Sequence, residues 1–243
     1  MKLAIITPTY RKLDGSTYTH LRNALESIKN QTHQDYKLFL IGDDYTDNDE
    51  LMELSKIITS EKIYVENLPV AIERLKFIEG AYSKFDLWRT GGVNAMNTAI
   101  IKALEEGYEY ICHLDHDDLF LENHLEIISE CIEKTGSNFI TTKCGCYPNI
   151  TPVKYYTNYR PVPSRLYKVG CCVNHKYFEN ILFKNLIEEE GRSYAADADL
   201  WIRISKILSN KNEYGIFINE TTCRHINGGI TLNKPEIIKE KEK

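Results

Sequence analysis

The chain has 243 residues, of which 42% are hydrophobic and 27% are charged, a composition that fits a globular protein with one large α/β domain. Its 30 basic and 35 acidic residues give a net charge of −5 without a basic stripe, which argues against nucleic acid as the main partner. No stretch approaches the ~20 apolar residues of a membrane-spanning helix, and the N-terminus lacks a signal-peptide core. We therefore expect a cytoplasmic protein with no integral membrane segment.

Strand-like and helix-like segments alternate through the first two thirds of the chain. Short apolar runs end in turn residues or acids, whereas longer segments place apolar residues three and four apart, the spacing of one helix face. Expected strands cover residues 2–7, 36–41, 62–66, 110–114 and 138–143, and expected helices cover residues 18–30, 51–58, 72–81, 94–106 and 122–134. Asp47 stands at the N-cap position of the second helix. This alternation predicts a mostly parallel sheet with helices on both faces.

Three carboxylates, Asp115, Asp117 and Asp118, follow the expected strand 110–114. Ligands bind at the carboxyl ends of such strands. If the extended geometry continues, Asp115 and Asp117 point the same way. Two carboxylates held that close repel each other unless a cation or a proton lies between them. Their oxygens suit Mg²⁺ or Mn²⁺, which would complete its shell with water and phosphate oxygens. A solvated acidic turn is the alternative; for Asp118 we expect a cap on the next helix, a role that Asn123 also fits.

A loop at residues 87–92 precedes the expected helix 94–106. Gly91 and Gly92 leave room for a ligand to approach the backbone, and a helix N-terminus favours an anion. The segment lacks the Lys-Ser/Thr pair of a P-loop. A plain loop therefore fits it as well, and Arg89 is the residue that favours a ligand role.

The regular alternation stops after residue 145. Residues 147–163 contain four of the seven prolines and four tyrosines, a composition typical of a lid or binding loop, although a rigid surface connection gives the same pattern. Further expected elements are strands at residues 165–173, 214–218 and 221–224 and helices at residues 174–180 and 197–208. The alternating basic and acidic residues 239–243 predict a frayed end.

Several of these segments, in this order, resemble the inverting family 2 glycosyltransferases with the GT-A-type fold. Residues 5–10, Ile-Ile-Thr-Pro-Thr-Tyr, resemble the opening strand and first donor loop of that family, and residues 41–48 resemble its second strand end. Residues 92–100 resemble the segment that usually carries an Arg-Asn pair; Asn97 matches the Asn, and Met96 replaces the Arg. Arg89 is a candidate for the work of that arginine.

The later segments agree with this resemblance. Residues 114–118, Leu-Asp-His-Asp-Asp, match the D-x-D element. Residues 194–203 resemble the Glu-Asp element that opens the acceptor-side helix, with Ala196 in the Glu position and Asp197 matching the Asp. Arg224-His225 with the following glycine pair resembles the segment near the donor phosphates. Matches in a fixed order are more specific than any one of them.

The resemblance implies a single α/β domain of GT-A type, Rossmann-like, with a mostly parallel mixed sheet flanked by helices. Its donor-binding half would span residues 1–146 and its acceptor-side half residues 147–233, followed by a flexible tail at 234–243. The implied activity is metal-dependent transfer of a sugar, with inversion, from a nucleotide donor, a UDP-sugar being favoured, to a saccharide or glycan acceptor. The implied site has Asp197 as general base, Asp115, Asp117 and His225 for Mn²⁺ or Mg²⁺, and Pro8, Thr9, Tyr10, Asp44, Arg89 and Asp115 for the donor.

Two alternatives stay open. The replacements at Met96 and Ala196 keep a catalytically silent nucleotide-sugar or carbohydrate-binding module in view, because likeness of fold does not guarantee activity. A sugar nucleotidyltransferase shares the sheet type, but it would need a glycine-rich, basic loop after the first strand, and residues 9–15 contain one glycine. The sequence leaves the donor sugar, the acceptor and the oligomeric state open.

Overall fold

The computed structural model describes residues 1–145, 159–163, 166–191 and 195–226. Its centre is an eight-stranded mixed sheet with strand order β3-β2-β1-β4-β7-β6-β8-β5. The strands are β1 (Leu3–Thr9), β2 (Tyr36–Asp43), β3 (Ile63–Leu68), β4 (Tyr110–His113), β5 (Asp118–Phe120), β6 (Phe139–Gly145), β7 (Cys171–Asn174) and β8 (Ile216–His225). The expected α/β fold with a mixed sheet is confirmed, and this one sheet uses strands from both halves of the chain.

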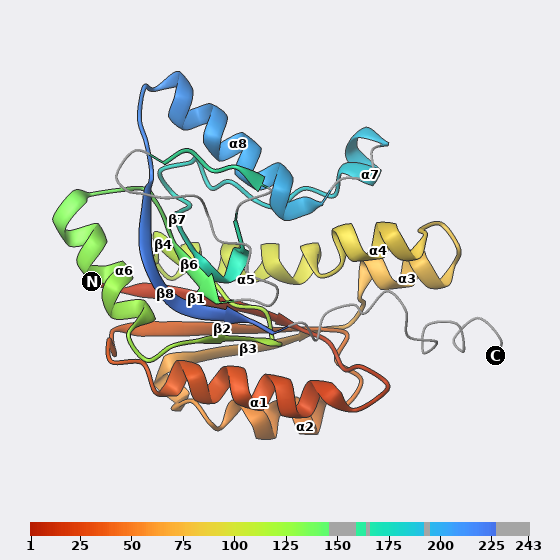
Figure 1. Ribbon diagram of the computed structural model, residues 1–243. Helices are drawn as coiled ribbons and strands as arrows, with labels where there is room; N and C mark the ends of the chain where they lie inside the picture. Colours follow the sequence, from red (N-terminus) through yellow and green to blue (C-terminus); the bar gives the residue numbers. More distant parts are fainter. Residues whose placement is uncertain (146–158, 164–165, 192–194, 227–243) are drawn as a thin grey trace.

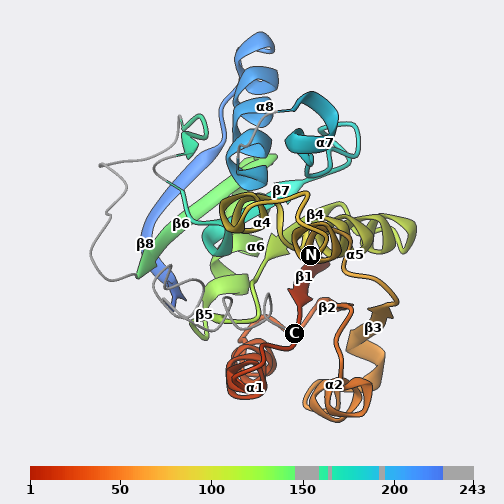
Figure 2. The ribbon, with the colours of Figure 1, turned by 90° about the vertical axis from the view of Figure 1, so that its right-hand side faces the viewer.

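Helices cover both faces of the sheet (Figure 1). They are α1 (Ser16–Lys29), α2 (Asn48–Ser55), α3 (Ile72–Ile78), α4 (Lys84–Thr90), α5 (Val93–Glu105), α6 (His124–Thr135), α7 (Leu186–Glu190) and α8 (Ala196–Asn210), with short 3₁₀ turns η1 (Ser60–Lys62) and η3 (Lys168–Gly170). Buried side chains of α1, α2 and α6 pack in one core cluster, and those of α5 and α8 pack in another. Figure 2 shows α1 and α2 on the opposite side of the sheet from α8.

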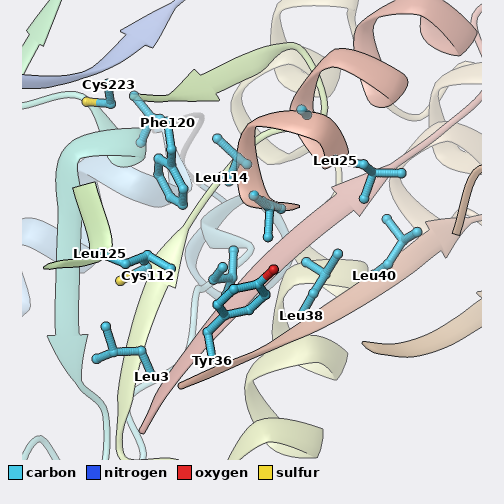
Figure 3. Packing of buried hydrophobic residues seen from close by; sticks show 14 of the residues in the cluster. Leu3, Leu25, Tyr36, Leu38, Leu40, Cys112, Leu114, Phe120, Leu125 and Cys223 are labelled. Atoms are coloured by element: carbon cyan, nitrogen blue, oxygen red, sulfur yellow. The ribbon is translucent and has the colours of Figure 1, made fainter. Parts of the chain in front are cut away.

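Alternation along the strands explains the two cores. In β1, Leu3 and Ile5 belong to the cluster with α1, whereas Ala4 and Ile6 belong to the cluster with α5. Successive side chains of a strand point to opposite faces, so a strand covered on both faces is apolar at every position. Figure 3 shows Leu114, which follows β4, among the buried leucines of the first cluster. Its burial anchors the chain immediately before the three carboxylates.

The carboxyl ends of three neighbouring strands meet at one edge of the sheet. β1 pairs in parallel with β2 on one side and with β4 on the other, with Thr9 opposite Gly42 and Ile6 opposite His113. The ends of these strands therefore bring the loop after β1, the acids at the end of β2 and the acids after β4 to the same edge. This edge is where ligands bind in open α/β sheets.

The structure differs from the expected elements in four places. Of the expected strand 165–173, residues 168–170 form η3 and only residues 171–173 belong to a strand, β7. The expected loop 87–92 is largely helix α4, which Ser83 and Asp86 open with a capping box. The expected helix 174–180 is a series of turns after β7. The two expected late strands form one strand, β8, whose pairing with β6 shifts register between Thr142 and Cys144. The expected loop 147–163 lies mostly outside the described residues, as do the boundary at 146/147, the glycine pair after His225 and the tail at 234–243.

Among the described residues, none of the helices combines the length and the apolar character that crossing a bilayer requires.

Candidate functional site

The three carboxylates after β4 lie in a tight turn. The Asp118 N–H donates to the carbonyl of Asp115 at 3.0 Å, so the chain reverses here and does not continue as an extended strand. The expectation that strand alternation points Asp115 and Asp117 the same way is therefore wrong. The expectation that Asp118 caps the next helix is also wrong: Asp118 belongs to β5, and Asn123 is the N-cap of α6. We call residues 115–118 the acidic turn.

Each carboxylate of the acidic turn faces a basic side chain from a distant part of the chain. Lys168 Nζ lies 2.6 Å from Asp115 Oδ1, and Lys12 Nζ lies 3.5 Å from Asp117 Oδ2. His225 Nδ1 lies 2.8 Å from Asp118 Oδ1. Like charges this close in sequence repel each other unless cations compensate them, and these three residues provide that compensation.

Because Asp117 and Asp118 are buried, their basic neighbours determine whether these carboxyl groups are ionised. Burial alone would raise the pKa of Asp117, but His116, Lys12 and His225 lower it below its ordinary value, so Asp117 is ionised at neutral pH. Burial raises the pKa of Asp118 to about 6. The hydrogen bond to Asp118 raises the pKa of His225 to about 9 against the effect of burial. At pH 7 Asp118 and His225 therefore form an ion pair.

A second group of residues surrounds the carboxyl end of β2. Asp43 is 4% exposed, and its Oδ1 has no hydrogen-bond partner among the described residues. Burial raises the pKa of Asp43 to about 6, and Arg74 opposes that rise. The Arg74 guanidinium in turn lies 4.0 Å from the ring centroid of Tyr10. Asp44, the residue expected to bind the base, is exposed and has a φ of 52°.

Pro8 and Thr9 lie at the end of β1, directly before Tyr10. Thr9 is 1% exposed, and its Oγ1 has no hydrogen-bond partner among the described residues. The ring of Tyr10 meets that of His116 edge-on at 5.3 Å. This contact links the loop after β1 to the acidic turn, so the structure brings the expected donor residues Thr9 and Tyr10 beside the expected metal residues.

The N-terminus of α5 has an acidic neighbour of its own. Glu73 of α3 is 3% exposed, and its Oε1 accepts the Asn94 N–H at 3.1 Å. Burial raises the pKa of Glu73 to about 7. Gly92 adopts a φ of 77°, and a Cβ there would lie 3.9 Å from Cβ of Pro8, so α5 begins close to β1. The anion-binding capacity expected for this helix end is thus partly used by Glu73.

Arg89 lies on α4, with its guanidinium 3.8 Å from the ring centroid of Phe85 on the same helix. Asn97 holds the backbone of Phe183 through two hydrogen bonds of 2.9 Å, an arrangement that fixes the segment before α7. Lys168 Nζ lies 3.3 Å from Met96 Sδ. The cation next to Met96 is therefore Lys168, which the sequence analysis did not single out.

Asp197 opens α8 from its first turn, where Ala195 is the N-cap residue. Its Oδ1 accepts the Ala198 N–H at 2.7 Å, and the side chain is partly exposed. Asp199 is engaged differently, because Arg203 Nε donates to its Oδ2 at 2.7 Å. Asp197 is thus the better placed of the two to receive a proton.

The acidic turn fits a divalent cation that is shared with a ligand. Among the described residues, no three His, Cys, Asp or Glu side chains are arranged as a ready metal cage. Mg²⁺ and related ions, however, are commonly held by one or two carboxylates together with substrate phosphates. Asp117 suits that role because it is ionised and because Lys12 Nζ, at 3.5 Å from Oδ2, is not in close contact with the carboxylate. His225 already uses Nδ1 for Asp118, and in its protonated form it has no lone pair for a metal.

Five residues of this site escaped the sequence analysis: Lys12, Asp43, Glu73, Arg74 and Lys168. Asp43 was adjacent to the expected Asp44, and a run of apolar residues ending at Gly42 was the only available signal that the first acid is the buried one. Lys168 lies 53 residues beyond Asp115 in the sequence, and no motif surrounds it.

The eight-stranded mixed sheet with helices on both faces is a GT-A-type fold. Solved structures support this class. The fold is similar to that of TarS of S. aureus, residues 1–349, in complex with UDP, with a TM-score of 0.68 and 14% identity over 93% of this chain. It is also similar to a mannosyltransferase from Pyrobaculum calidifontis in complex with GDP-Man and Mn²⁺, with a TM-score of 0.62 and 13% identity over 94% of this chain. The chain spans 60% and 58% of those two structures.

Sequence relatives identify the family. The chain is 32% identical to an uncharacterized glycosyltransferase of Acanthamoeba polyphaga mimivirus over 96% of its own length and 97% of the relative. It is 26% identical over 94% of its length to an uncharacterized glycosyltransferase of Rickettsia conorii, of which it covers 33%. No family model matches the chain. The chain belongs to the glycosyltransferases.

Proposed function

We propose that the protein is an inverting, metal-dependent glycosyltransferase of family 2 that moves a sugar from a UDP-sugar to a hydroxyl of a saccharide or glycan. The observation that carries the proposal is the acidic turn. It places an ionised carboxylate, Asp117, at the sheet edge where β1, β2 and β4 end. The nucleotides in the two structural neighbours support a diphosphate ligand, one being UDP and the other GDP-Man with Mn²⁺.

The donor base would lie between Tyr10 and the end of β2. We assign the base contact to Asp43 and no longer to Asp44, because Asp43 is buried with one oxygen unpartnered, whereas Asp44 is exposed. A carboxylate can accept the ring N–H that uracil offers. Tyr10, which Arg74 covers on one face, supplies an aromatic surface beside that acceptor.

The diphosphate would lie at the acidic turn. Asp117 is the main carboxylate for Mn²⁺ or Mg²⁺, with Asp115 at the ribose or the donor sugar. His225 donates from its second ring nitrogen to a phosphate oxygen, because its Nδ1 is taken by Asp118. When bound, a divalent cation neutralises the charge that develops on the departing diphosphate. Arg89 can contact the sugar donor only if its side chain rotates away from the ring of Phe85.

Asp197 is the proposed general base. The oxygen of the acceptor hydroxyl forms a bond to the anomeric carbon while the bond from that carbon to the phosphate oxygen breaks. The hydroxyl proton passes to Asp197, and the nucleoside diphosphate leaves from the opposite face. A carboxylate is a weak base, but proton transfer late in the reaction requires only placement within hydrogen-bond reach. Attack from the face opposite the leaving group inverts the anomeric configuration.

The test separates binding from chemistry. We expect Mn²⁺ to strengthen UDP binding at least about tenfold by calorimetry, and Asp117→Asn to remove that gain, because a neutral amide no longer holds the cation. We expect Asp197→Asn to keep the UDP affinity and to lower sugar transfer or donor hydrolysis by about a hundredfold or more. Glu109→Gln, at the exposed ion pair with Lys176, is the matched control.

Two outcomes would contradict the proposal. A gain from Mn²⁺ that persists in Asp117→Asn would exclude the acidic turn as the metal site. Transfer by Asp197→Asn at the wild-type rate would remove Asp197 from the base role. A wild type that binds UDP and Mn²⁺ but neither transfers nor hydrolyses any common UDP-sugar would favour a binding module.

A further inference from the structure

Lys168 is a largely buried lysine that contacts the acidic turn. It begins η3, which packs against β4, β5, β6 and β8, and its side chain is 15% exposed. Its Nζ lies 2.6 Å from Asp115 Oδ1 and 3.3 Å from Met96 Sδ. It also lies 6.0 Å from the ring centroid of Phe183. An ammonium largely withdrawn from water requires a carboxylate partner, and Asp115 is the one in contact.

Several carboxylates influence the charge of Lys168. Burial lowers the pKa of Lys168, but Asp115, Asp197 and Asp118 together raise it above the ordinary value. Asp115 belongs to the acidic turn, whereas Asp197 opens α8. Lys168 therefore lies within electrostatic reach of both the proposed donor carboxylate and the proposed base.

The two lysines at the acidic turn lie at different distances from their carboxylate partners. Lys168 contacts Asp115 at 2.6 Å, a hydrogen-bonded ion pair, whereas Lys12 lies 3.5 Å from Asp117. A divalent cation that approaches the turn would have to displace the close ammonium in order to bind Asp115. At Asp117 the separation is wider, so Asp117 is the carboxylate that a cation takes more easily.

We propose that Lys168 is a positioning residue of the transfer reaction, which holds Asp115 in its place at the donor and directs the divalent cation to Asp117. This inference rests on the proposed function. It implies two opposite effects when the charge of Lys168 is removed. Asp115 becomes available to the cation, so metal binding tightens, while the donor loses its fixed carboxylate, so transfer slows.

The experiment compares Lys168→Met and Lys168→Arg with the wild type. Mn²⁺ alone is titrated into the nucleotide-free protein by calorimetry, and turnover is measured with the UDP-sugar that the wild type hydrolyses or transfers. We expect Lys168→Met to bind Mn²⁺ about tenfold or more tightly, because the Asp115 carboxylate is then available to the cation. We expect its kcat to fall at least about tenfold, whereas Lys168→Arg keeps the wild-type affinity for Mn²⁺.

Two controls test whether the change in Mn²⁺ affinity is specific to Lys168 and whether it depends on Asp115. Lys176→Met removes an exposed lysine paired with Glu109 and should change neither measurement. In an Asp115→Asn background, Lys168→Met should no longer tighten Mn²⁺ binding, because the gain acts through the Asp115 carboxylate. If Lys168→Met does not fold, Lys168→Gln is measured in the same way.

The results separate the two proposals. Mn²⁺ affinity that is unchanged or weaker in Lys168→Met, or turnover equal to that of the wild type, overturns the role of Lys168. A merely structural lysine would weaken both measurements together. A wild type that binds Mn²⁺ and shows the gain in Lys168→Met, but transfers no sugar, overturns the proposed function and leaves Lys168 as the residue that directs the cation.

Discussion

Single residues account for the part of the site that the sequence predicted and for the part that it missed. The acids were visible because they interrupt apolar strands, and carboxylates after a buried strand require partners. Two of their partners were not visible, because Lys12 and Lys168 come from a loop and a 3₁₀ turn. His225 was expected beside these acids as a metal ligand, and the structure pairs it with Asp118. A lone lysine in a sequence is most often a solvated surface residue. Only the folded chain shows which lysines lie against the acids.

The choice between Asp43 and Asp44 shows the same limit. Both follow the same apolar run, and one residue of register decides which is buried. β2 extends through Asp43 and pairs with β3 up to that residue, so Asp43 stays inside and Asp44 turns outward with a positive φ. Asp readily adopts that conformation. The sequence therefore predicted an acid at this strand end but not which of the two acids is buried.

Glu73 gives a prediction on pH. Burial raises its pKa from 4.5 to about 7, so the folded protein binds a proton between these values that the unfolded chain has released. Stability therefore falls as the pH rises from about 4.5 to 7 and then levels off. Glu73→Gln keeps the acceptor for Asn94 and removes the charge. We expect the variant to be more stable than the wild type by about 1 to 3 kcal/mol at pH 8, and no more stable near pH 4.5.

Urea unfolding at the two pH values measures this difference. Glu79→Gln, at the exposed end of the same helix, should show no such dependence on pH. An equal loss of stability in Glu73→Gln at both pH values would mean that the carboxylate is ionised and satisfied in the folded protein.

At the scale of the elements, periodicity predicted most helices, and local capping decided the exceptions. The glycine pair at Gly91 and Gly92 favoured a loop, but the capping box of Ser83 and Asp86 begins a helix that lasts until Thr90. After β7, the chain makes turns instead of a helix, because His175 donates its N–H to Glu109 and Asn180 donates to His175. Such contacts depend on neighbours and are absent from the local pattern.

Asp47 gives a prediction at this scale. The sequence placed it at the N-cap of the second helix, and its side chain accepts the Glu50 N–H at 3.0 Å, which confirms the position. We expect Asp47→Ala to lower the free energy of unfolding by about 1 kcal/mol, because one N–H at the start of α2 loses its partner. Urea unfolding measures the loss, with Thr46→Ala at an exposed neighbouring position as control. No change in Asp47→Ala would mean that water replaces the cap without loss.

At the scale of the whole molecule, the first half of the sheet could be predicted and its closure could not. β1, β2, β3 and β4 follow the strand-helix alternation, whose handedness and parallel pairing are general rules. β5 instead pairs with β8, placing Asp118 opposite His225, 107 residues later. No local signal specifies such a pairing. It is nevertheless the pairing that completes the acidic edge, since it brings His225 to Asp118.

Because residues from both halves meet at this edge, a ligand there should stabilise the fold as a whole. A ligand that binds only the folded state adds about 2.7 kcal/mol at a hundred times its Kd. For a chain of this size that corresponds to a rise in Tm of roughly 5 to 10 °C. We expect UDP with Mn²⁺ to produce such a shift, and UDP with EDTA to produce a smaller one, since the diphosphate then adds its charge to the acidic turn without the cation.

The identity of the nucleotide's base gives a second test of the same sheet edge. If Asp43 accepts the ring N–H of uracil, Asp43→Asn should reduce the shift with UDP and Mn²⁺ by several degrees, because the amide offers one acceptor oxygen and two donor protons. Asp44→Asn, at the exposed neighbour, should leave the shift unchanged. A thermal-shift panel of UDP, GDP and dTDP, with both variants, decides the matter. A larger rise in Tm with GDP than with UDP would mean that the donor is a GDP-sugar. An equal effect of Asp43→Asn and Asp44→Asn would mean that Asp43 does not contact the nucleobase.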